Sequence, residues 1–322
     1  MRRILEGTPG MTIAELAEAS KLSKATVSRI VKRLEEEGLV STVTRGRNKH
    51  VYLNKTRERR KHVVIGIIRA SEYLFLPFIV KKLKSKGYNV EVKVYNEGLT
   101  LTKHIAMGVL DMGYSPLVTQ LLYYRFNPTY KVIYGGVYGG AGILSNPHSA
   151  TDKGGSTPIS TMEACIRSYD KDVNVQYYYS GEGILKALRR GDIKIGAIWE
   201  PYLSDGIKMG YRFEAQCSEL VAPYCCTLAV NNEFLEEEQA LRSLVEQSLE
   251  EYKHNPLRMV SWYAKITRTP VVVLKKSYKS YSISGDIDRS KVRNILEKVG
   301  VKLPSPSMMI EPINYSSPSI NA

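Results

Sequence analysis

Residues 63–68 read Val63-Val64-Ile65-Gly66-Ile67-Ile68, a near-continuous apolar run. Such a run predicts a strand buried on both faces, as in a parallel sheet covered by helices. An apolar helical stripe follows and ends before Gly87, and valines at 90, 92 and 94 then alternate as the next strand. Repeated strand–helix–strand units of this kind predict an α/β fold.

The alternation of predicted strands and helices continues further along the chain. Gly98 opens another predicted helix, residues 110–113 form a short strand, and Ser115-Pro116 begins a further helix, where proline is well tolerated. A similar plan recurs between Gly191 and Pro201, where a helix ends, a short strand follows and a polar residue precedes proline. This weak internal similarity suggests two lobes of similar construction that face each other across a cleft.

The first sixty residues follow a different plan. Thr12 and Glu15 have the spacing of a capping box, which predicts a short helix through Ala19. Ser23 can cap a second helix that runs to about Glu37. Gly38 is expected to end this helix, because glycine readily adopts the left-handed backbone conformation. In this second helix an apolar stripe is expected to pack on the first helix; its members are Val27, Ile30, Val31 and Leu34, and their partners are Ile13, Leu16 and Ala17.

The opposite face of the second helix is basic, and a strand pair with a cationic tip follows it. A helix with this face suits the major groove of DNA, where its first residues reach base edges and later cations meet phosphates. A basic hairpin beside such a helix is typical of the wing of a winged helix. The expected DNA-binding residues are Lys24, Ala25, Thr26, Ser28, Arg29, Lys32, Arg33, Arg45, Arg47, Asn48 and Lys49.

Charge supports the same interpretation. The chain has 322 residues and a formal net charge of +14. Residues 1–62 contain 15 Lys and Arg against 7 Asp and Glu, so this first fifth holds +8 of that charge. Dense positive charge on a small module favours a nucleic-acid partner, although a solvated basic surface would give the same count.

The segment resembles a MarR-type or related winged helix-turn-helix over about 45 residues, and the motifs that carry the resemblance lie between Thr12 and Val40. The helix expected before the turn covers only residues 2–6. Residues 54–62 are expected to form a short charged linker, too short for a long dimerisation helix. The domain boundaries that follow are 1–53 for the winged helix, 54–62 for the linker, 63–304 for a second domain and 305–322 for a tail.

The second domain resembles the type 2 periplasmic-binding-protein superfamily, in the branch that binds nitrate, sulfonates, taurine and the thiamine pyrimidine precursor. The resemblance lies in residues 108–113 and in Gly191-Asp192-Ile193-Lys194-Ile195-Gly196-Ala197-Ile198-Trp199-Glu200-Pro201-Tyr202. It implies a two-lobed α/β domain with crossings near 140–146 and 225–230. Lobe I would comprise 63–143 and 228–304, and lobe II 144–227.

In such folds ligands sit beyond the carboxyl ends of the strands, where helix N-termini point inward. The residues at these positions are candidates for contact with a ligand, and about half of them are expected to be helix caps only. They are Arg69, Ser71, Glu72, Gly98, Thr100, Tyr114, Ser115, Ser156, Thr157, Ser160, Thr161, Ser180, Gly181, Glu182, Trp199 and Glu200.

The four cysteines do not resemble a metal motif or a disulfide framework. No CxxC or HxxH pair exists, and Cys225 and Cys226, adjacent on a predicted strand, would point to opposite faces. We therefore expect Cys165, Cys217, Cys225 and Cys226 to be buried free thiols, with no metal and no cofactor.

Other classes are disfavoured by what the sequence lacks. No apolar run approaches the roughly 18 residues of a membrane span, and the start has no signal-peptide pattern, so a cytoplasmic, non-membrane protein is expected. The glycine-rich run at 135–140 lacks the lysine of a P-loop.

The resulting hypothesis is a one-component transcriptional regulator with a LysR-like arrangement, not an enzyme. A small metabolite, anionic or heteroaromatic, would bind in the cleft of a homodimer and alter its affinity for double-stranded DNA. Three alternatives stay open: a cytoplasmic enzyme like the thiamine pyrimidine synthases, a ligand-binding module whose winged helix contacts protein, and an architectural DNA binder without a ligand.

Overall fold

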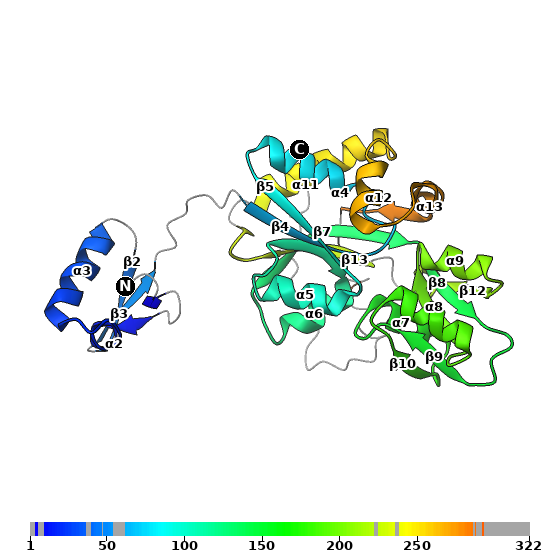
Figure 1. The fold of residues 1–322 in the computed structure, drawn as a ribbon, viewed down its shortest axis with the longest axis horizontal. Coiled ribbons are helices and arrows are strands. Elements are labelled where there is room, and N and C mark those ends of the chain that lie inside the picture. The colour runs from blue at the N-terminus through cyan, green and yellow to red at the C-terminus, as the bar shows by residue number, and fades with distance from the viewer. Residues whose placement is uncertain are drawn as a thin grey trace, which may run out of the picture. The chain divides into compact units, whose positions relative to one another are not determined.

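A computed structural model gives the fold of the chain (Figure 1). It describes residues 4–5, 10–36, 40–46, 48–53, 62–221, 225–235, 238–285, 287 and 292. Two compact units are present, Met1–Lys61 and His62–Ala322. The expected linker covers residues 54–62. Residues 54–61 of it lie outside the described residues, and His62 already belongs to the first strand of the second unit. The expected tail at 305–322 also lies outside the described residues.

The first unit is a winged helix. Thr12 caps the first helix, and both reciprocal hydrogen bonds of the expected capping box with Glu15 are formed. The three strands pair in the order β1-β3-β2. The elements are β1 (Met11–Thr12), α2 (Ile13–Ser20), α3 (Lys24–Glu36), β2 (Val40–Arg45) and β3 (Asn48–Leu53). Of the short helix expected at residues 2–6, only Ile4 and Leu5 are described, and both are helical.

The core of this unit forms where the sequence pattern places it. Leu16 of α2 and Val27 and Val31 of α3 are fully buried together, with Ile13 and Leu34 packed against them. Ile30 is only half buried. The α3 helix starts as expected, because the Ser23 hydroxyl accepts from the Thr26 amide at 3.1 Å. The Gly38 stop lies outside the described residues.

Lobe I of the second unit is built on a six-stranded mixed sheet with the order β14-β7-β13-β6-β4-β5. The apolar run at 63–68 forms β4, which pairs in parallel with β5 and β6. Figure 1 shows α4 and α11 on one side of this sheet and α5 and α6 on the other. The strands are β4 (His62–Ile68), β5 (Asn89–Tyr95), β6 (Met112–Pro116), β7 (Tyr130–Gly139), β13 (Cys226–Asn231) and β14 (Tyr281–Ile283). The helices are α4 (Leu76–Ser85), α5 (Gly98–Ala106), α6 (Leu117–Tyr124), α11 (Glu238–His254), α12 (Val260–Thr267), α13 (Val271–Ser277) and the 3₁₀ turn η2 (Tyr278–Ser280).

Lobe II is built on a five-stranded mixed sheet with the order β10-β9-β11-β8-β12. Its strands are β8 (Ala141–Ser145), β9 (Lys153–Ser156), β10 (Asn174–Tyr177), β11 (Ile195–Trp199) and β12 (Arg212–Gln216). Its helices are α7 (Thr161–Tyr169), α8 (Gly181–Arg190), α9 (Tyr202–Lys208) and α10 (Cys217–Leu220).

The chain passes between the lobes twice, slightly earlier than expected each time. It leaves lobe I between β7 and β8, where Gly139 and Gly140 both have positive φ and so end β7. It returns between α10 and β13. Residues 141–143 therefore lie in lobe II and not in lobe I, and residues 226–227 lie in lobe I and not in lobe II. In the part of the chain that the structure describes, no helix is long and apolar enough to cross a membrane.

Candidate functional site

The first candidate site is the outer face of α3. Its basic and polar side chains are exposed, because the apolar stripe on the other side packs into the core. The exposed residues are Lys24, Ala25, Ser28, Arg29, Lys32 and Arg33, and Thr26 is half buried. The hydroxyls of Ser23 and Thr26 lie 2.8 Å apart, which ties Thr26 to the start of the helix.

The wing is linked to α3 through one carboxylate. Glu35 accepts a hydrogen bond from the Thr42 hydroxyl at 2.5 Å and pairs with the Lys49 ammonium at 3.3 Å. Asn48 and Lys49 are exposed near the hairpin tip. Arg45 ends β2, and Arg47 lies outside the described residues.

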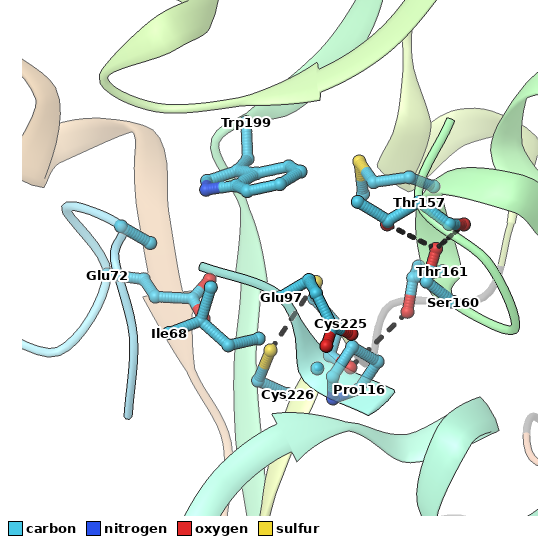
Figure 2. Close-up of a pocket in the computed structure, with 13 residues that line it drawn as sticks. Ile68, Glu72, Glu97, Pro116, Thr157, Ser160, Thr161, Trp199, Cys225 and Cys226 are labelled. Carbon is cyan, nitrogen blue, oxygen red and sulfur yellow. Dashed lines mark hydrogen bonds between the residues drawn. The ribbon is translucent and has the colours of Figure 1, made fainter. Parts of the chain in front are cut away.

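The second candidate site is a pocket in the second unit, shown in Figure 2, that encloses about 380 Å³ of space not filled by atoms, part of it open to solvent. It lies beyond the carboxyl ends of strands from both lobes, where ligands bind in open α/β sheets. Its lining residues are Ile68, Ala70, Glu72, Glu97, Gly98, Pro116, Thr157, Ser160, Thr161, Met162, Trp199, Cys225 and Cys226.

Direct hydrogen bonds join the two lobes beside this pocket. The Trp199 indole at the end of β11 donates to the Arg69 carbonyl at 3.1 Å. The Ser71 amide donates to the Glu200 carbonyl at 3.0 Å. Because Arg69 and Ser71 follow β4 of lobe I, these contacts hold the end of β11 against lobe I.

On the lobe I side, a carboxylate of the chain occupies the N-terminus of α5. Glu97 caps the helix, with its two oxygens accepting from the amides of Leu99 at 2.5 Å and Thr100 at 2.8 Å. Gly98 must be glycine, since a Cβ there would come within 2.3 Å of the Pro116 ring. The amides that could have bound an anion are therefore already satisfied by Glu97.

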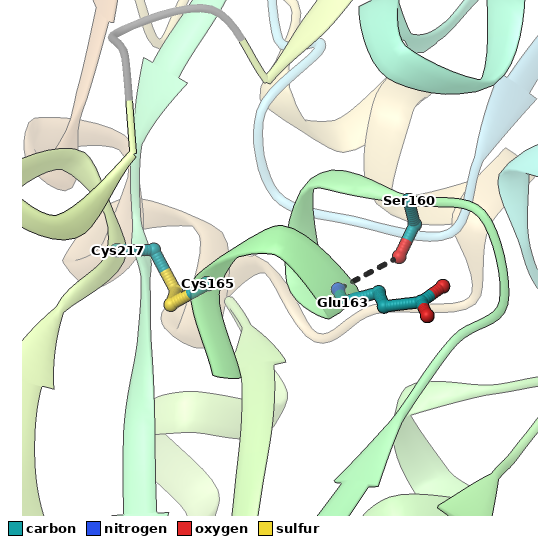
Figure 3. The surroundings of a disulfide bond; sticks show 4 residues. All are labelled: Ser160, Glu163, Cys165 and Cys217. Carbon is teal, nitrogen blue, oxygen red and sulfur yellow. Dashed lines mark hydrogen bonds between the residues drawn. A yellow bond between two sulfur atoms is a disulfide. The ribbon is translucent and has the colours of Figure 1, made fainter. Parts of the chain in front are cut away.

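On the lobe II side, a disulfide fixes the helix that contributes Thr161 and Met162. Cys165 of α7 is bonded to Cys217 at the start of α10, with an S–S distance of 2.06 Å (Figure 3). The expectation of free thiols was therefore wrong for these two cysteines. Their separation of 52 residues gives no local sequence signal, and only the packing of α7 on α10 brings them together.

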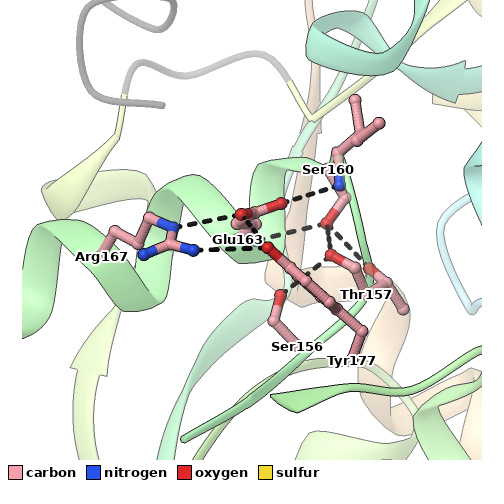
Figure 4. Close-up of polar contacts among 7 residues, drawn as sticks. Ser156, Thr157, Ser160, Glu163, Arg167 and Tyr177 are labelled. Carbon is pink, nitrogen blue, oxygen red and sulfur yellow. Dashed lines mark hydrogen bonds and ion pairs between the residues drawn. The ribbon is translucent and has the colours of Figure 1, made fainter. Parts of the chain in front are cut away.

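The turn before α7 is held by a polar network, shown in Figure 4. The Thr157 and Ser160 hydroxyls lie 2.8 Å apart, and Ser160 also donates to the Thr157 carbonyl. Ile159 has a φ of 50°, unusual for a β-branched residue, and its amide donates to Glu163 at 2.8 Å. Glu163 is held in turn by Arg167 and Tyr177. The network thus fixes a strained turn whose hydroxyls line the pocket.

Between the lobes lies Glu72, whose side chain is almost completely buried. Burial raises the pKa of its carboxyl to about 7, with partial compensation by neighbouring Tyr73 and Cys226. Glu72 also lines a second cavity, of about 490 Å³ including open solvent, with Ser71, Tyr252, Lys253, Tyr278, Tyr281 and Ile283.

The adjacent cysteines also differ from expectation. Their sulfurs lie 3.8 Å apart, and both residues line the pocket (Figure 2). The prediction that they point to opposite faces was wrong because β13 begins at Cys226, so Cys225 precedes the strand and strand alternation does not apply.

Six of the sixteen predicted ligand residues line the pocket: Glu72, Gly98, Thr157, Ser160, Thr161 and Trp199. The structure places others in supporting positions. The Ser115 hydroxyl is buried in hydrogen bonds with Thr102 and Gln120, Ser156 donates to the Thr157 carbonyl, and Glu200 accepts from Ser204. Arg69, Ser71 and Tyr114 are near but do not line this pocket.

Four predicted ligand residues lie away from the pocket. Thr100 is exposed and only its amide is used, in the Glu97 cap. Ser180 caps α8, Gly181 packs against the Tyr202 ring, and Glu182 forms an exposed ion pair with Lys186.

The sequence reasoning missed one carboxylate, Glu97, and all the sulfur-containing residues of the pocket. Glu97 was overlooked because helix caps are more often Ser, Thr, Asp or Asn. Cys225 and Cys226 were discounted on strand alternation. Ile68, Ala70, Pro116 and Met162 complete the missed lining.

Comparison of the sequence with known families gives one match. Residues 3–41 match the family described as winged helix-turn-helix DNA-binding. No curated protein sequence matches the chain.

Comparison of the fold gives many matches to the second unit. The alkanesulfonate-binding protein SsuA from Xanthomonas axonopodis pv. citri has a TM-score of 0.63 at 14% identity, covering 80% of this chain and 99% of that one. The ligand-binding component of an ABC-type import system from Staphylococcus aureus has 0.61 at 16%, covering 78% and 98%. A Candida albicans protein described as having the generic periplasmic-binding-protein fold has 0.62 at 13%, covering 79% and 96%.

These findings define the architecture. The chain joins a winged helix-turn-helix DNA-binding domain to a two-lobed α/β domain with the periplasmic-binding-protein fold.

The Glu97 cap yields a first prediction. Glu97→Ala should lower the free energy of unfolding by about 1 kcal/mol, the usual value for a lost cap. It should also free the Leu99 and Thr100 amides, so that sulfate raises the melting temperature of the variant but not of the parent protein. Glu182→Ala, which removes an exposed first-turn carboxylate from α8, is the matched control. Equal stabilisation of parent and variant by sulfate would contradict the interpretation.

The disulfide yields a second prediction. Cys217→Ser should lower the free energy of unfolding by about 2 to 5 kcal/mol, since the bond closes a loop of 52 residues. Denaturant titrations with and without reductant measure this. Reductant should bring the parent protein to the stability of the variant and leave the variant unchanged, while Cys225→Ser keeps the reductant response. A parent protein insensitive to reductant would show that the bond contributes no stability.

Proposed function

We propose that the protein is a one-component transcriptional regulator whose affinity for DNA is set by a small ligand in the pocket between lobes I and II. The proposal rests on one observation: a single chain joins a DNA-binding domain with an exposed basic helix to a ligand-binding fold with a pocket at its strand ends. In this proposal the pocket binds its ligand without converting it, and the protein works in the compartment that contains the DNA.

Ligand binding would act by shifting the relative position of the lobes. The pocket takes residues from both lobes, so a ligand that contacts Glu72 and Thr161 together favours the closed arrangement. One winged helix reads a half-site, so two chains would be needed for a two-fold operator. Ligand and DNA must then influence each other's affinity by the same factor.

The lining chemistry narrows the class of ligand. Two carboxylates, Glu72 and Glu97, line the pocket, and none of the described lining residues is Lys, Arg or His. A neutral or cationic ligand suits this lining better than the anionic metabolite that the resemblance to sulfonate-binding proteins implied. The Trp199 ring remains available to a planar ligand.

The direct test is selection of sheared genomic DNA by the purified protein at near-physiological salt, followed by sequencing. Enrichment of a few two-fold sites is the expected result, and the genes beside them would nominate the ligand. If DNA is retained without sequence preference, in the presence and absence of a metabolite extract, the protein is an architectural binder. If none is retained under either condition, the winged helix contacts protein instead.

Variants of the basic face give a third prediction. Arg29→Ala should cost about 1 to 3 kcal/mol on the selected site and relax the base preference at one position. Lys49→Ala should weaken binding to all sequences alike and lower the slope of log affinity against log salt, as expected for a phosphate contact. By the same reasoning, Arg47→Ala should behave like Lys49→Ala.

Lys171→Ala is the matched control, because it removes an exposed cation from lobe II. Affinities are measured by titration of labelled selected and scrambled duplexes at several salt concentrations. Unchanged affinity in both Arg29→Ala and Lys49→Ala would mean that this face does not bind DNA.

A further inference from the structure

Three side chains with metal-binding atoms converge in the pocket. The carboxylate of Glu72 and the sulfurs of Cys225 and Cys226 all lie within 4.8 Å of one another (Figure 2). They come from two distant parts of the chain, the loop after β4 and the start of β13. This is a mixed set of one oxygen and two sulfur ligands, unlike a cluster of acidic residues on a surface.

The backbone holds the two thiols in this arrangement. The Cys225 amide donates to the Val137 carbonyl at 3.1 Å, and the Leu117 amide donates to the Cys225 carbonyl at 3.0 Å. Gly136 allows the close approach of β13, because a Cβ there would lie 1.6 Å from the Cys226 carbonyl oxygen. The backbone positions of both cysteines are thus set at the crossing between the lobes.

The spacing of the sulfurs matches a tetrahedral metal site. Two thiolates bound at about 2.3 Å to one tetrahedral Zn²⁺ lie about 3.8 Å apart. The observed separation of the two sulfurs is 3.8 Å. A carboxylate oxygen in the same site would lie about 3.6 Å from each sulfur, and since the ligand atoms lie within 4.8 Å of one another, Glu72 needs to approach by about 1.2 Å at most.

Buried donors beside the cluster lack acceptors. The Tyr73 hydroxyl is fully buried and makes no hydrogen bond of good geometry, although Glu72 and Cys226 are the groups that face it. The Ser71 hydroxyl is also buried without a hydrogen-bond partner, but Ser71 lines the second cavity and not the pocket that contains the cysteines. Metal-bound carboxylates and thiolates accept hydrogen bonds from such neighbours, which orient them.

We propose that Glu72, Cys225 and Cys226 form a binding site for one thiophilic divalent cation of the Zn²⁺ class, with a fourth coordination position open to the pocket. Both thiols lose their protons to solvent when the ion binds, and Glu72 binds as the carboxylate. The two thiolates balance the two positive charges of the ion, and the Glu72 carboxylate leaves the occupied site with a net charge of −1.

The site itself does not depend on the proposed function. Its role does: as part of a ligand-controlled regulator, the ion would be the effector, or would hold the effector at its fourth position, and would change the affinity for DNA.

Binding is tested on the full-length protein with Co²⁺ as the probe and Zn²⁺ as the competitor. Thiol titration under non-reducing conditions should first give two free thiols, since Cys165 and Cys217 are bonded. One equivalent of Co²⁺ should then produce the visible bands of tetrahedral Co²⁺ and a thiolate charge-transfer band, and Zn²⁺ should abolish both.

Variants identify the ligands. Cys225→Ser should weaken binding by about 100-fold or more and halve the charge-transfer intensity, and Cys226→Ser should do the same. Glu72→Gln should weaken binding while leaving the charge-transfer band of both thiolates. Glu246→Gln, which changes an exposed carboxylate of α11 outside the pocket, is the control and should bind as the parent protein does. Circular dichroism checks folding, and Cys225 is the safer substitution because it is half exposed.

The outcomes separate the site from its role. Absence of the charge-transfer band, or its persistence in the double variant Cys225→Ser/Cys226→Ser, overturns the site whatever the protein does with DNA. The stoichiometric band together with a several-fold change in DNA affinity on adding Zn²⁺ supports both. The band with unchanged DNA affinity establishes the site and overturns its role as effector.

Discussion

The pairing of β13 between β6 and β7 is the constraint on which the second unit depends. This strand returns from lobe II and enters the middle of the lobe I sheet, antiparallel to both neighbours. The first residues of β13 lie at the crossing between the lobes. The neighbouring strand has Gly136 at this point, because a side chain there would collide with the Cys226 carbonyl. The same pairing therefore closes the sheet of lobe I, defines the second crossing and places two thiols beside the pocket.

The pocket shows how a shared fold can hold different chemistry. The fold places a helix N-terminus at the end of a strand, an arrangement that favours negative charge. In this chain the carboxylate of Glu97 supplies that negative charge, because it accepts hydrogen bonds from the first amides of α5. An anionic ligand is therefore not needed at this helix N-terminus. With Glu72 opposite and two sulfurs between the lobes, the pocket is suited to a neutral or positively charged species. Similarity of fold to sulfonate-binding proteins therefore does not by itself identify the ligand of this chain.

The contacts that hold the pocket in shape differ between lobe II and the interface of the two lobes. On the lobe II side, a disulfide and the Glu163 network fix α7 and the turn before it. Between the lobes, the described contacts are single hydrogen bonds, such as those from Trp199 and Ser71, together with an apolar core that is continuous through both lobes. A ligand that contacts both lobes would act on this shared interface, where a ligand-controlled change in their relative position has to occur.

The sequence by itself determined both domains and their main elements. Local signals sufficed for the capping box at Thr12, the apolar stripe of α3 and the buried strand at 63–68, because each depends on neighbours within one or two turns of chain. They also identified six residues of the pocket, since strand ends followed by helix starts can be read locally. Only the tertiary structure decided the cysteine chemistry. Cys165 and Cys217 are 52 residues apart, and Glu72 lies more than 150 residues before Cys225, so their contacts arise from packing between elements that no local pattern encodes.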